Sequence, residues 1–183
     1  MIITISGALG SGKSTVAKIL VEKFNLKHYS TGDFMREIAA KRGITLLELS
    51  KLAETDRSID KELDNYQIQL GKDEDNFIID ARLGWHFIPD SIKIFLDVND
   101  EEAAKRIFKE GRTDEKYNTD LNATLENIKN RRESEIKRYQ DYYNQNYYDH
   151  DNYDLVVDTT NIPAEEVAEK IIKFIEGRKW LKK

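Results

Sequence analysis

The chain has no cysteine, only two prolines among its 183 residues, and no apolar run as long as a membrane-spanning helix. Without cysteine it can form neither a disulfide nor a thiolate metal site. Without about 18 consecutive apolar residues it offers no membrane span. A β-branched apolar stretch starts at Met1 itself, so we expect no signal peptide. We therefore expect a cytoplasmic protein with no membrane partner.

The chain also lacks a linker rich in proline, glycine and serine, and it has no excess of positive charge. A length of 183 residues allows one well-buried core, so we expect a single domain over 1–183. We also expect a monomer, although the sequence itself leaves the oligomeric state open. The net charge of −5 argues against a general affinity for nucleic acid. Any anion site must therefore be a local cluster of basic side chains.

The most informative feature that is present is a glycine-rich loop. Residues 7–14 read GALGSGKS and complete the pattern G-x-x-x-x-G-K-[ST]. In this pattern backbone N–H groups point at a polyphosphate, Lys13 reaches its outer phosphates, and the Ser14 hydroxyl binds Mg²⁺. A β-branched run precedes the loop and a helical pattern follows it, as the motif requires. The residues predicted to bind ATP are Gly7, Ala8, Leu9, Gly10, Ser11, Gly12, Lys13, Ser14 and Thr15.

Strand-like runs alternate with helical patterns along the chain. The runs are Ile2–Ser6, Lys27–Ser30, Phe77–Asp80, Ile92–Asp97 and Tyr153–Val157. This alternation predicts an α/β fold with a five-stranded, mostly parallel, doubly wound sheet. Such sheets bind ligands outside the carboxyl ends of their strands, which is where polar residues such as Thr31, Asp33 and Asp80 fall.

Two helical regions are predicted as insertions around a core formed by residues 1–33, 73–108 and 149–183. Residues 34–72 form the first, an acceptor-binding insertion with helix breaks at Gly43 and Gly71. Residues 109–148 form the second, a lid followed by a long, tyrosine-rich helix. We expect both insertions to move so that closure excludes water.

Charged residues near the strand ends suggest a reaction. Asp80 ends the third run beside the first, where P-loop proteins place the acid that holds Mg²⁺ through water. Arg131, Glu135 and Arg138 are spaced i, i+4, i+7 and share one helix face. That face alone could be an ordinary salt-bridged surface.

Further arginines, Arg36 and Arg82, follow the second and third runs. A kinase that moves a phosphoryl group between two phosphorylated molecules must hold two anions close together, and arginine binds phosphate bidentately. A phosphate acceptor is already an anion, so it needs orientation and neutralisation rather than a base. We therefore predict a phosphate acceptor, with charge on the moving group stabilised by Lys13, Arg82, Arg131 and Arg138.

Together these residues resemble the nucleoside monophosphate kinases, and most closely the short archaeal-type cytidylate kinases. The resemblance covers nearly the whole chain and implies the P-loop kinase fold. It is carried by the glycine-rich loop and by residues 30–37 (STGDFMRE), 59–64 (IDKELD), 80–85 (DARLGW), 132–139 (RESEIKRY) and 153–160 (YDLVVDTT).

The resemblance implies roles for several residues, with ATP as donor, CMP or dCMP as acceptor and Mg²⁺ as cofactor. On the acceptor side it implies that Arg36 and Arg82 contact the monophosphate, that Thr31 and Asp33 lie beside the nucleoside, and that Glu135 faces the sugar. On the donor side it implies that Arg106 stacks on adenine, that Arg112 lies in the lid, and that the backbone near Asn161 wraps adenine. Which of Arg106, Arg112 and Arg132 contacts the transferred group stays open.

The chain departs from the family pattern in two places, so the acceptor base also stays open. Residues 30–33 (STGD) are more typical of adenylate kinases, whereas residues 80–82 (DAR) lack the Gly-Phe-Pro-Arg that those enzymes carry. The alternatives are an adenylate kinase and a kinase for a hydroxyl acceptor such as shikimate or gluconate. A non-catalytic nucleotide-binding regulator is disfavoured, because no guanine-reading Asn-Lys-x-Asp segment occurs.

Overall fold

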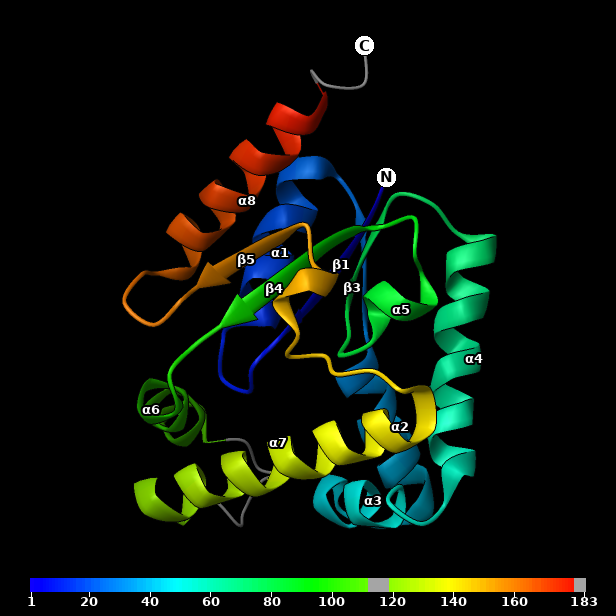
Figure 1. Cartoon of the computed structure of the whole chain (residues 1–183). Coiled ribbons are helices and arrows are strands. Elements are labelled where there is room, and N and C mark those ends of the chain that lie inside the picture. Colours follow the sequence, from blue (N-terminus) through cyan, green and yellow to red (C-terminus); the bar gives the residue numbers. More distant parts are fainter. Residues whose placement is uncertain (112–118, 180–183) are drawn as a thin grey trace.

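A computed structural model describes residues 1–111 and 119–179 of the chain (Figure 1). Five strands form one sheet in the order β2-β3-β1-β4-β5, and all four neighbouring pairs are parallel. The strands are β1 (Ile2–Gly7), β2 (Lys27–Ser30), β3 (Phe77–Asp80), β4 (Ile92–Asp97) and β5 (Leu155–Asp158). The predicted doubly wound sheet is confirmed, and in the described chain it is parallel throughout.

The last strand begins two residues later than its sequence pattern predicts. Residues 150–152 form a short 3₁₀ turn, and the Tyr153 N–H donates to the His150 carbonyl at 3.1 Å. That N–H is therefore engaged by the turn. Pairing with β4 starts at the next residue, where the Asp154 N–H donates to the Lys93 carbonyl at 2.8 Å.

Helices connect the strands and build the two regions outside the core. They are α1 (Lys13–Phe24), α2 (Thr31–Arg42), α3 (Leu46–Leu52), α4 (Arg57–Asp73), α5 (Gly84–Phe87), α6 (Asp100–Glu110), α7 (Leu121–Tyr143) and α8 (Ala164–Lys179). Gly43 and Gly111 end α2 and α6 in the left-handed region, at φ 68° and 57°, a conformation that glycine adopts without steric cost. The helix end at Gly43 is as predicted.

Gly71, in contrast, does not break a helix. It lies inside α4, which continues to Asp73, although glycine within a helix costs about 1 kcal/mol relative to alanine. A β-carbon on Gly71 would lie 3.1 Å from the Ile88 side chain. The residue therefore serves close packing of α4 against the segment after α5, and the prediction of a break was wrong.

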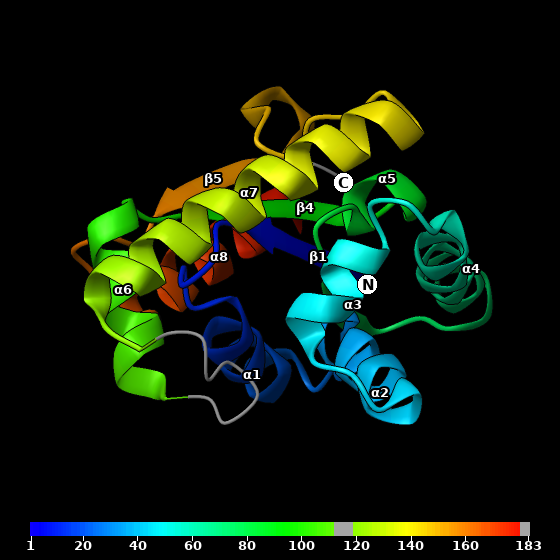
Figure 2. The ribbon, with the colours of Figure 1, turned by 90° about the horizontal axis from the view of Figure 1, so that it is seen from below.

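Helices cover both faces of the sheet and frame its carboxyl edge. On one face α1 and α8 bury a cluster that includes Leu20, Ile94 and Ile171. On the other face Trp85, Phe95 and Tyr147 pack together. Figure 2, seen from the carboxyl edge, shows α7 crossing from α6 on one side towards α3 and α4 on the other. Among the described residues, no helix is long and apolar enough to span a membrane.

Candidate active site

The glycine-rich loop is wedged between β4 and α6, where side chains would collide with the backbone. A β-carbon on Gly7 (φ 149°) would lie 2.2 Å from the Leu96 carbonyl oxygen, and one on Gly10 (φ 73°) would lie 2.9 Å from the Ala103 Cα. Gly12, at φ 83°, immediately precedes α1. The loop thus leads into a helix N-terminus, whose N–H groups and dipole favour a bound anion.

Lys13 folds back over this loop. Its Nζ donates to the carbonyl oxygens of Ala8, at 2.8 Å, and of Gly7, at 3.2 Å. Burial and the neighbouring Arg82 cation lower the pKa of Lys13 to about 7. The protein alone therefore stabilises the charged form of Lys13 only in part, and the negative charge of a polyphosphate would stabilise it further.

Ser14 and Asp80 lie together at the start of α1 and the end of β3. The Ser14 Oγ donates to Asp80 Oδ2 at 2.7 Å, and Thr31 Oγ1 donates to the Asp80 carbonyl at 3.1 Å. A hydroxyl and a carboxylate beside a phosphate loop match the hard oxygen ligands of Mg²⁺, which usually completes its octahedron with phosphates and water. The residues predicted from sequence for the metal are thus adjacent, and their chemistry fits the ion.

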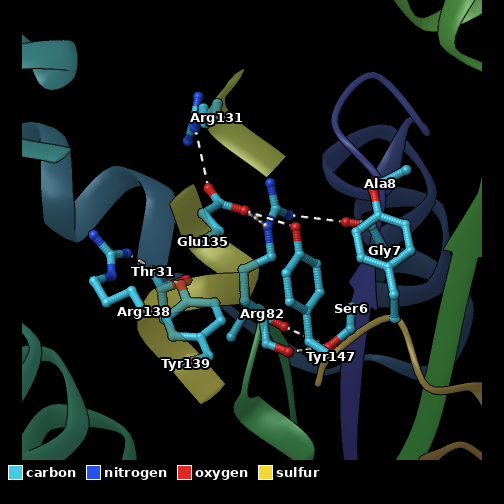
Figure 3. A network of polar contacts seen from close by, with 12 residues as sticks. Ser6, Gly7, Ala8, Thr31, Arg82, Arg131, Glu135, Arg138, Tyr139 and Tyr147 are labelled. Atoms are coloured by element: carbon cyan, nitrogen blue, oxygen red, sulfur yellow. Dashed lines mark hydrogen bonds and ion pairs between the residues drawn. The ribbon is translucent and has the colours of Figure 1, made fainter. Parts of the chain in front are cut away.

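A buried carboxylate, Glu135 of α7, joins two arginines and a tyrosine (Figure 3). Its Oε2 accepts from Arg82 Nε and from the Tyr147 hydroxyl, both at 2.8 Å, and its Oε1 accepts from Arg131 Nε at 3.1 Å. Arg82 also donates from Nη1 to the Gly7 carbonyl at 3.0 Å. We call Arg82, Arg131, Glu135 and Tyr147 the Glu135 cluster; through Arg82 it touches the phosphate loop.

The charge of Glu135 is what holds this cluster together. Burial by itself would raise the pKa of the Glu135 carboxyl, but Arg82 and Arg131 outweigh it and keep that pKa well below its usual value. Glu135 is 7% exposed and Arg138 is 8% exposed. The face that carries Arg131, Glu135 and Arg138 is therefore not an ordinary salt-bridged surface.

Arg138 lies one turn further along α7, towards α3 and α4. Its Nε lies 3.4 Å from Asp60 Oδ2, and its Nη1 donates to the Ser50 carbonyl at 3.3 Å. The structure thus places Arg138 against the predicted acceptor insertion. Its action on the moving phosphoryl group stays a prediction.

A pocket opens beside the cluster, between α4 and the segment after β3. Its wall is formed by Thr31, Asp60, Leu63, Asp64, Gln67, Arg82, Leu83, Phe87 and Tyr139. Two predicted acceptor residues, Thr31 and Arg82, are part of it. Asp33 and Arg36 are not among the described residues that form the wall. These two pair with each other on α2, where Arg36 Nη1 donates to Asp33 Oδ1 at 2.9 Å.

The residues predicted to contact adenine are Arg106 of α6 and Asn161, which follows β5. Arg106 donates to the carbonyls of Thr159, at 2.8 Å, Thr160, at 3.1 Å, and Gly10, at 3.5 Å. Asn161 follows Thr160 and is exposed. Arg106 therefore ties the segment after β5 to the loop, and its stacking on adenine stays a prediction.

The two remaining lid arginines differ in what can be said of them. Arg132 forms a bidentate pair with Asp100 of α6, at 2.6 and 2.8 Å, which fixes α7 against α6. Arg112 lies outside the described residues.

Sequence reasoning missed Tyr147 and the polar face of α4. Tyr147 follows the end of α7 in irregular structure, so no periodicity marks it as a partner of Glu135. Asp60, Asp64 and Gln67 were assigned no function, although their spacing of four and three residues places them on one helix face. Polar residues repeating at that spacing were the signal available.

The fold and the phosphate loop define the chain as a P-loop kinase. Shikimate kinase from Bacteroides thetaiotaomicron has a similar fold, with a TM-score of 0.68 over 96% of this chain and 98% of that chain, at 14% identity. Residues 2–161 match the family model described as the cytidylate kinase-like family. The chain therefore belongs to that family of kinases, as the resemblance in its motifs predicts.

Two relatives illustrate the match. The cytidylate kinase of Sulfurisphaera tokodaii is 38% identical over 96% of this chain and 95% of its own length. The cytidylate kinase of Haloquadratum walsbyi is 37% identical over 92% of this chain and 86% of its own length. The family-model match over residues 2–161 includes the phosphate loop, α4, α7 and the strand ends.

Proposed function

We propose that this protein, acting as a monomer, transfers the γ-phosphoryl group of ATP to CMP or dCMP and gives ADP and CDP or dCDP. The observation that carries the proposal is the Glu135 cluster. It fixes Arg82 between the phosphate loop and a pocket and holds Arg131 on the same carboxylate, which suits a pair of phosphates that must approach each other. Membership of the cytidylate kinase-like family supports the pyrimidine acceptor.

Positively charged side chains between the phosphate loop and the pocket would stabilise the phosphoryl transfer. An oxygen of the acceptor phosphate attacks the γ-phosphorus in line, while the bond from that phosphorus to the bridging oxygen breaks and ADP leaves with the electron pair. Lys13 lies on the loop side of the moving group. Arg82, which touches the loop and lines the pocket, lies between donor and acceptor. Arg131 and Arg138 would add positive charge from α7.

Ser14 and, through water, Asp80 would hold Mg²⁺, which when bound neutralises charge on the phosphates. Thr31, Asp33 and Arg36 are proposed to hold the acceptor, with Glu135 near its sugar. Arg106 and Asn161 are proposed to flank the adenine of ATP.

Closure over both substrates would keep water from the γ-phosphorus. The acceptor insertion already touches α7, because the Tyr142 hydroxyl donates to the Ala53 carbonyl at 3.2 Å and Arg138 reaches Ser50. Residues 34–72 and 109–148 are the proposed moving parts around this contact.

The test is ADP formation with a panel of acceptors: CMP, dCMP, UMP, AMP and shikimate. We expect CMP or dCMP to give the highest kcat/KM, and shikimate to leave the slow hydrolysis of ATP unchanged. The proposal is wrong if none of CMP, dCMP and UMP stimulates turnover. Arg36→Ala should lower kcat/KM for any monophosphate acceptor, whereas a kinase for a hydroxyl acceptor would keep most of its activity after this change.

A further inference from the structure

The α4 side of the pocket carries three polar side chains for which the transfer step gives no account. Asp60, Asp64 and Gln67 follow one another along a single face of α4 and all line the pocket. Asp60 and Gln67 are each only 2% exposed. Polar groups buried to this degree are costly unless they find partners. The face therefore calls for a ligand with matching hydrogen-bond groups.

Two hydrogen-bond donors of this wall already donate to backbone carbonyl oxygens of the protein. Gln67 Nε2 donates to the Leu63 carbonyl at 3.4 Å, while Gln67 Oε1 is buried with no hydrogen-bond partner in the described part of the chain. The Thr31 hydroxyl donates to the Asp80 carbonyl at 3.1 Å. The amide oxygen of Gln67 and the lone pairs of Thr31 are thus left as acceptors.

Asp64 adds a carboxylate to the same wall. One oxygen, Oδ2, accepts from the Tyr143 hydroxyl at 2.6 Å. Burial raises the pKa of Asp64 to about 6, although the Tyr143 hydrogen bond opposes this. Asp60 Oδ2 also has no hydrogen-bond partner among the described residues, but the Arg138 cation lies 3.4 Å from it and offsets its charge. Asp64 is therefore the carboxylate that a donor group on a ligand would stabilise most.

The pocket has a phosphate end and an opposite end. Arg82 lines it on the side of the loop, because the same side chain donates to the Gly7 carbonyl. Asp64 and Gln67 lie on α4, which Figure 1 shows beyond the end of α7 that is away from α6. A nucleoside monophosphate with its phosphate at Arg82 would direct its base towards α4.

We propose that Asp64 and Gln67 read the acceptor base by accepting hydrogen bonds from an exocyclic amino group, which makes the pocket selective for cytosine over uracil. This inference rests on the proposed function. Cytosine presents an N4 amino donor at the position where a 4-oxo pyrimidine presents an acceptor oxygen, and carboxylates accept from that amino group. A 4-oxo base would face acceptor oxygens with another acceptor and leave all of them unpaired.

The experiment compares kcat/KM for CMP and for UMP in the full-length wild type and in Asp64→Asn. The Tyr143 hydroxyl needs an acceptor, so the amide oxygen of the new side chain takes that side and its NH₂ group faces the pocket. That group can donate to the uracil oxygen but cannot accept from cytosine. We expect the CMP-over-UMP preference to fall at least about 10-fold, the size of one good base contact.

The control is Asp73→Asn, which removes the same charge from an exposed position on α4. A second variant, Gln67→Met, removes the acceptor oxygen at similar size; it should lower kcat/KM for CMP and leave that for UMP nearly unchanged. Its control is Gln69→Met, also exposed on α4. If Asp64→Asn does not fold, Gln67→Met alone decides.

The outcomes separate this inference from the proposed function. Equal losses with CMP and UMP would mean that the residues contact the sugar or support the fold, and an unchanged ratio would mean that they do not read the base; either result overturns the inference. A wild type that uses UMP as well as CMP also overturns it while the proposed function stands. A wild type inactive with CMP, dCMP and UMP contradicts the proposed function itself.

Discussion

The donor and acceptor halves of the site are built in opposite ways. The phosphate-binding part of the proposed donor half is a single stretch of nine residues, Gly7–Thr15, whose backbone N–H groups would meet the phosphates. The proposed acceptor half is a pocket lined by side chains of α2, α4, α7 and the segment after β3. Backbone groups are the same for every sequence, whereas side chains can discriminate. We infer that the donor half supplies general phosphate binding and that the acceptor half carries the specificity.

The halves also differ in the sign of the buried charge that a ligand would compensate. Burial lowers the pKa of Lys13 in the donor half to about 7 and raises the pKa of Asp64 in the acceptor half to about 6. Each group is a charge that its protein surroundings only partly stabilise. One awaits an anion and the other a hydrogen-bond donor, so the two ends of the site select opposite ends of a nucleotide.

The largest effect is expected for Lys13→Met. Loss of its positive charge should lower kcat at least about 100-fold, as for the loss of a group that stabilises the transition state. Because Lys13 belongs to the donor half, the factor should be the same for every acceptor. Steady-state ADP formation with CMP, dCMP and UMP measures this, with Lys18→Met, exposed on α1, as control. If Lys13→Met lowers kcat by different factors for different acceptors, the donor and acceptor halves do not act separately.

Glu135→Gln tests the carboxylate that joins the halves. Arg82 and Arg131 would lose their buried counter-charge, and breaking such a pair costs about 3 kcal/mol or more. We expect a lower Tm and a loss of activity with all acceptors, whereas Glu133→Gln, exposed on the same helix, should change neither.

The pH dependence of that loss has a definite sign. Since the pKa of Glu135 is depressed in the folded protein, its stabilising contribution is present above the unfolded-state value of about 4.3 and is lost as the pH falls below it. The Tm difference between wild type and Glu135→Gln should therefore shrink under acid conditions. A difference that stays constant down to acid unfolding would show that charge is not the cause.

Tyr147→Phe removes one hydrogen bond from Glu135 and keeps the aromatic ring. We expect a stability loss of about 1 kcal/mol, typical of a single hydrogen bond, and a severalfold lower kcat at nearly unchanged KM for ATP, because Arg82 is less firmly held. Tyr148→Phe, which removes a hydroxyl that does not bond to Glu135, is the control. If both variants lose stability and activity alike, Tyr147 merely supports the fold.

Features that depend on local spacing could be predicted from the sequence, whereas contacts between distant segments could not. The phosphate loop, all five strands and the charged face of α7 were predictable because each depends on local spacing. The hydrogen bond from Tyr147 to Glu135 joins irregular structure to a helix, and the continuation of α4 through Gly71 depends on Ile88, 17 residues further along the chain. Contacts of this kind depend on packing, which outweighs the local preference of a residue.

The smallest expected effect is a proton taken up when ATP binds. With a pKa of about 7 in the free protein, Lys13 is largely neutral at pH 8, and the charge of a bound triphosphate would raise that pKa again. By linkage, ATP binding should then take up close to one proton at pH 8 and about half a proton at pH 7. The proton uptake is measured by calorimetric titrations with a non-hydrolysable ATP analogue in buffers of different ionisation enthalpy.

Lys13→Arg, which is charged at every accessible pH, corrects for protons exchanged by the nucleotide itself. CMP bound alone should show no such uptake if the donor half carries this charge by itself. Equal uptake in wild type and Lys13→Arg would instead locate the proton elsewhere, and the contrast between a cationic and an anionic end would lose its donor half.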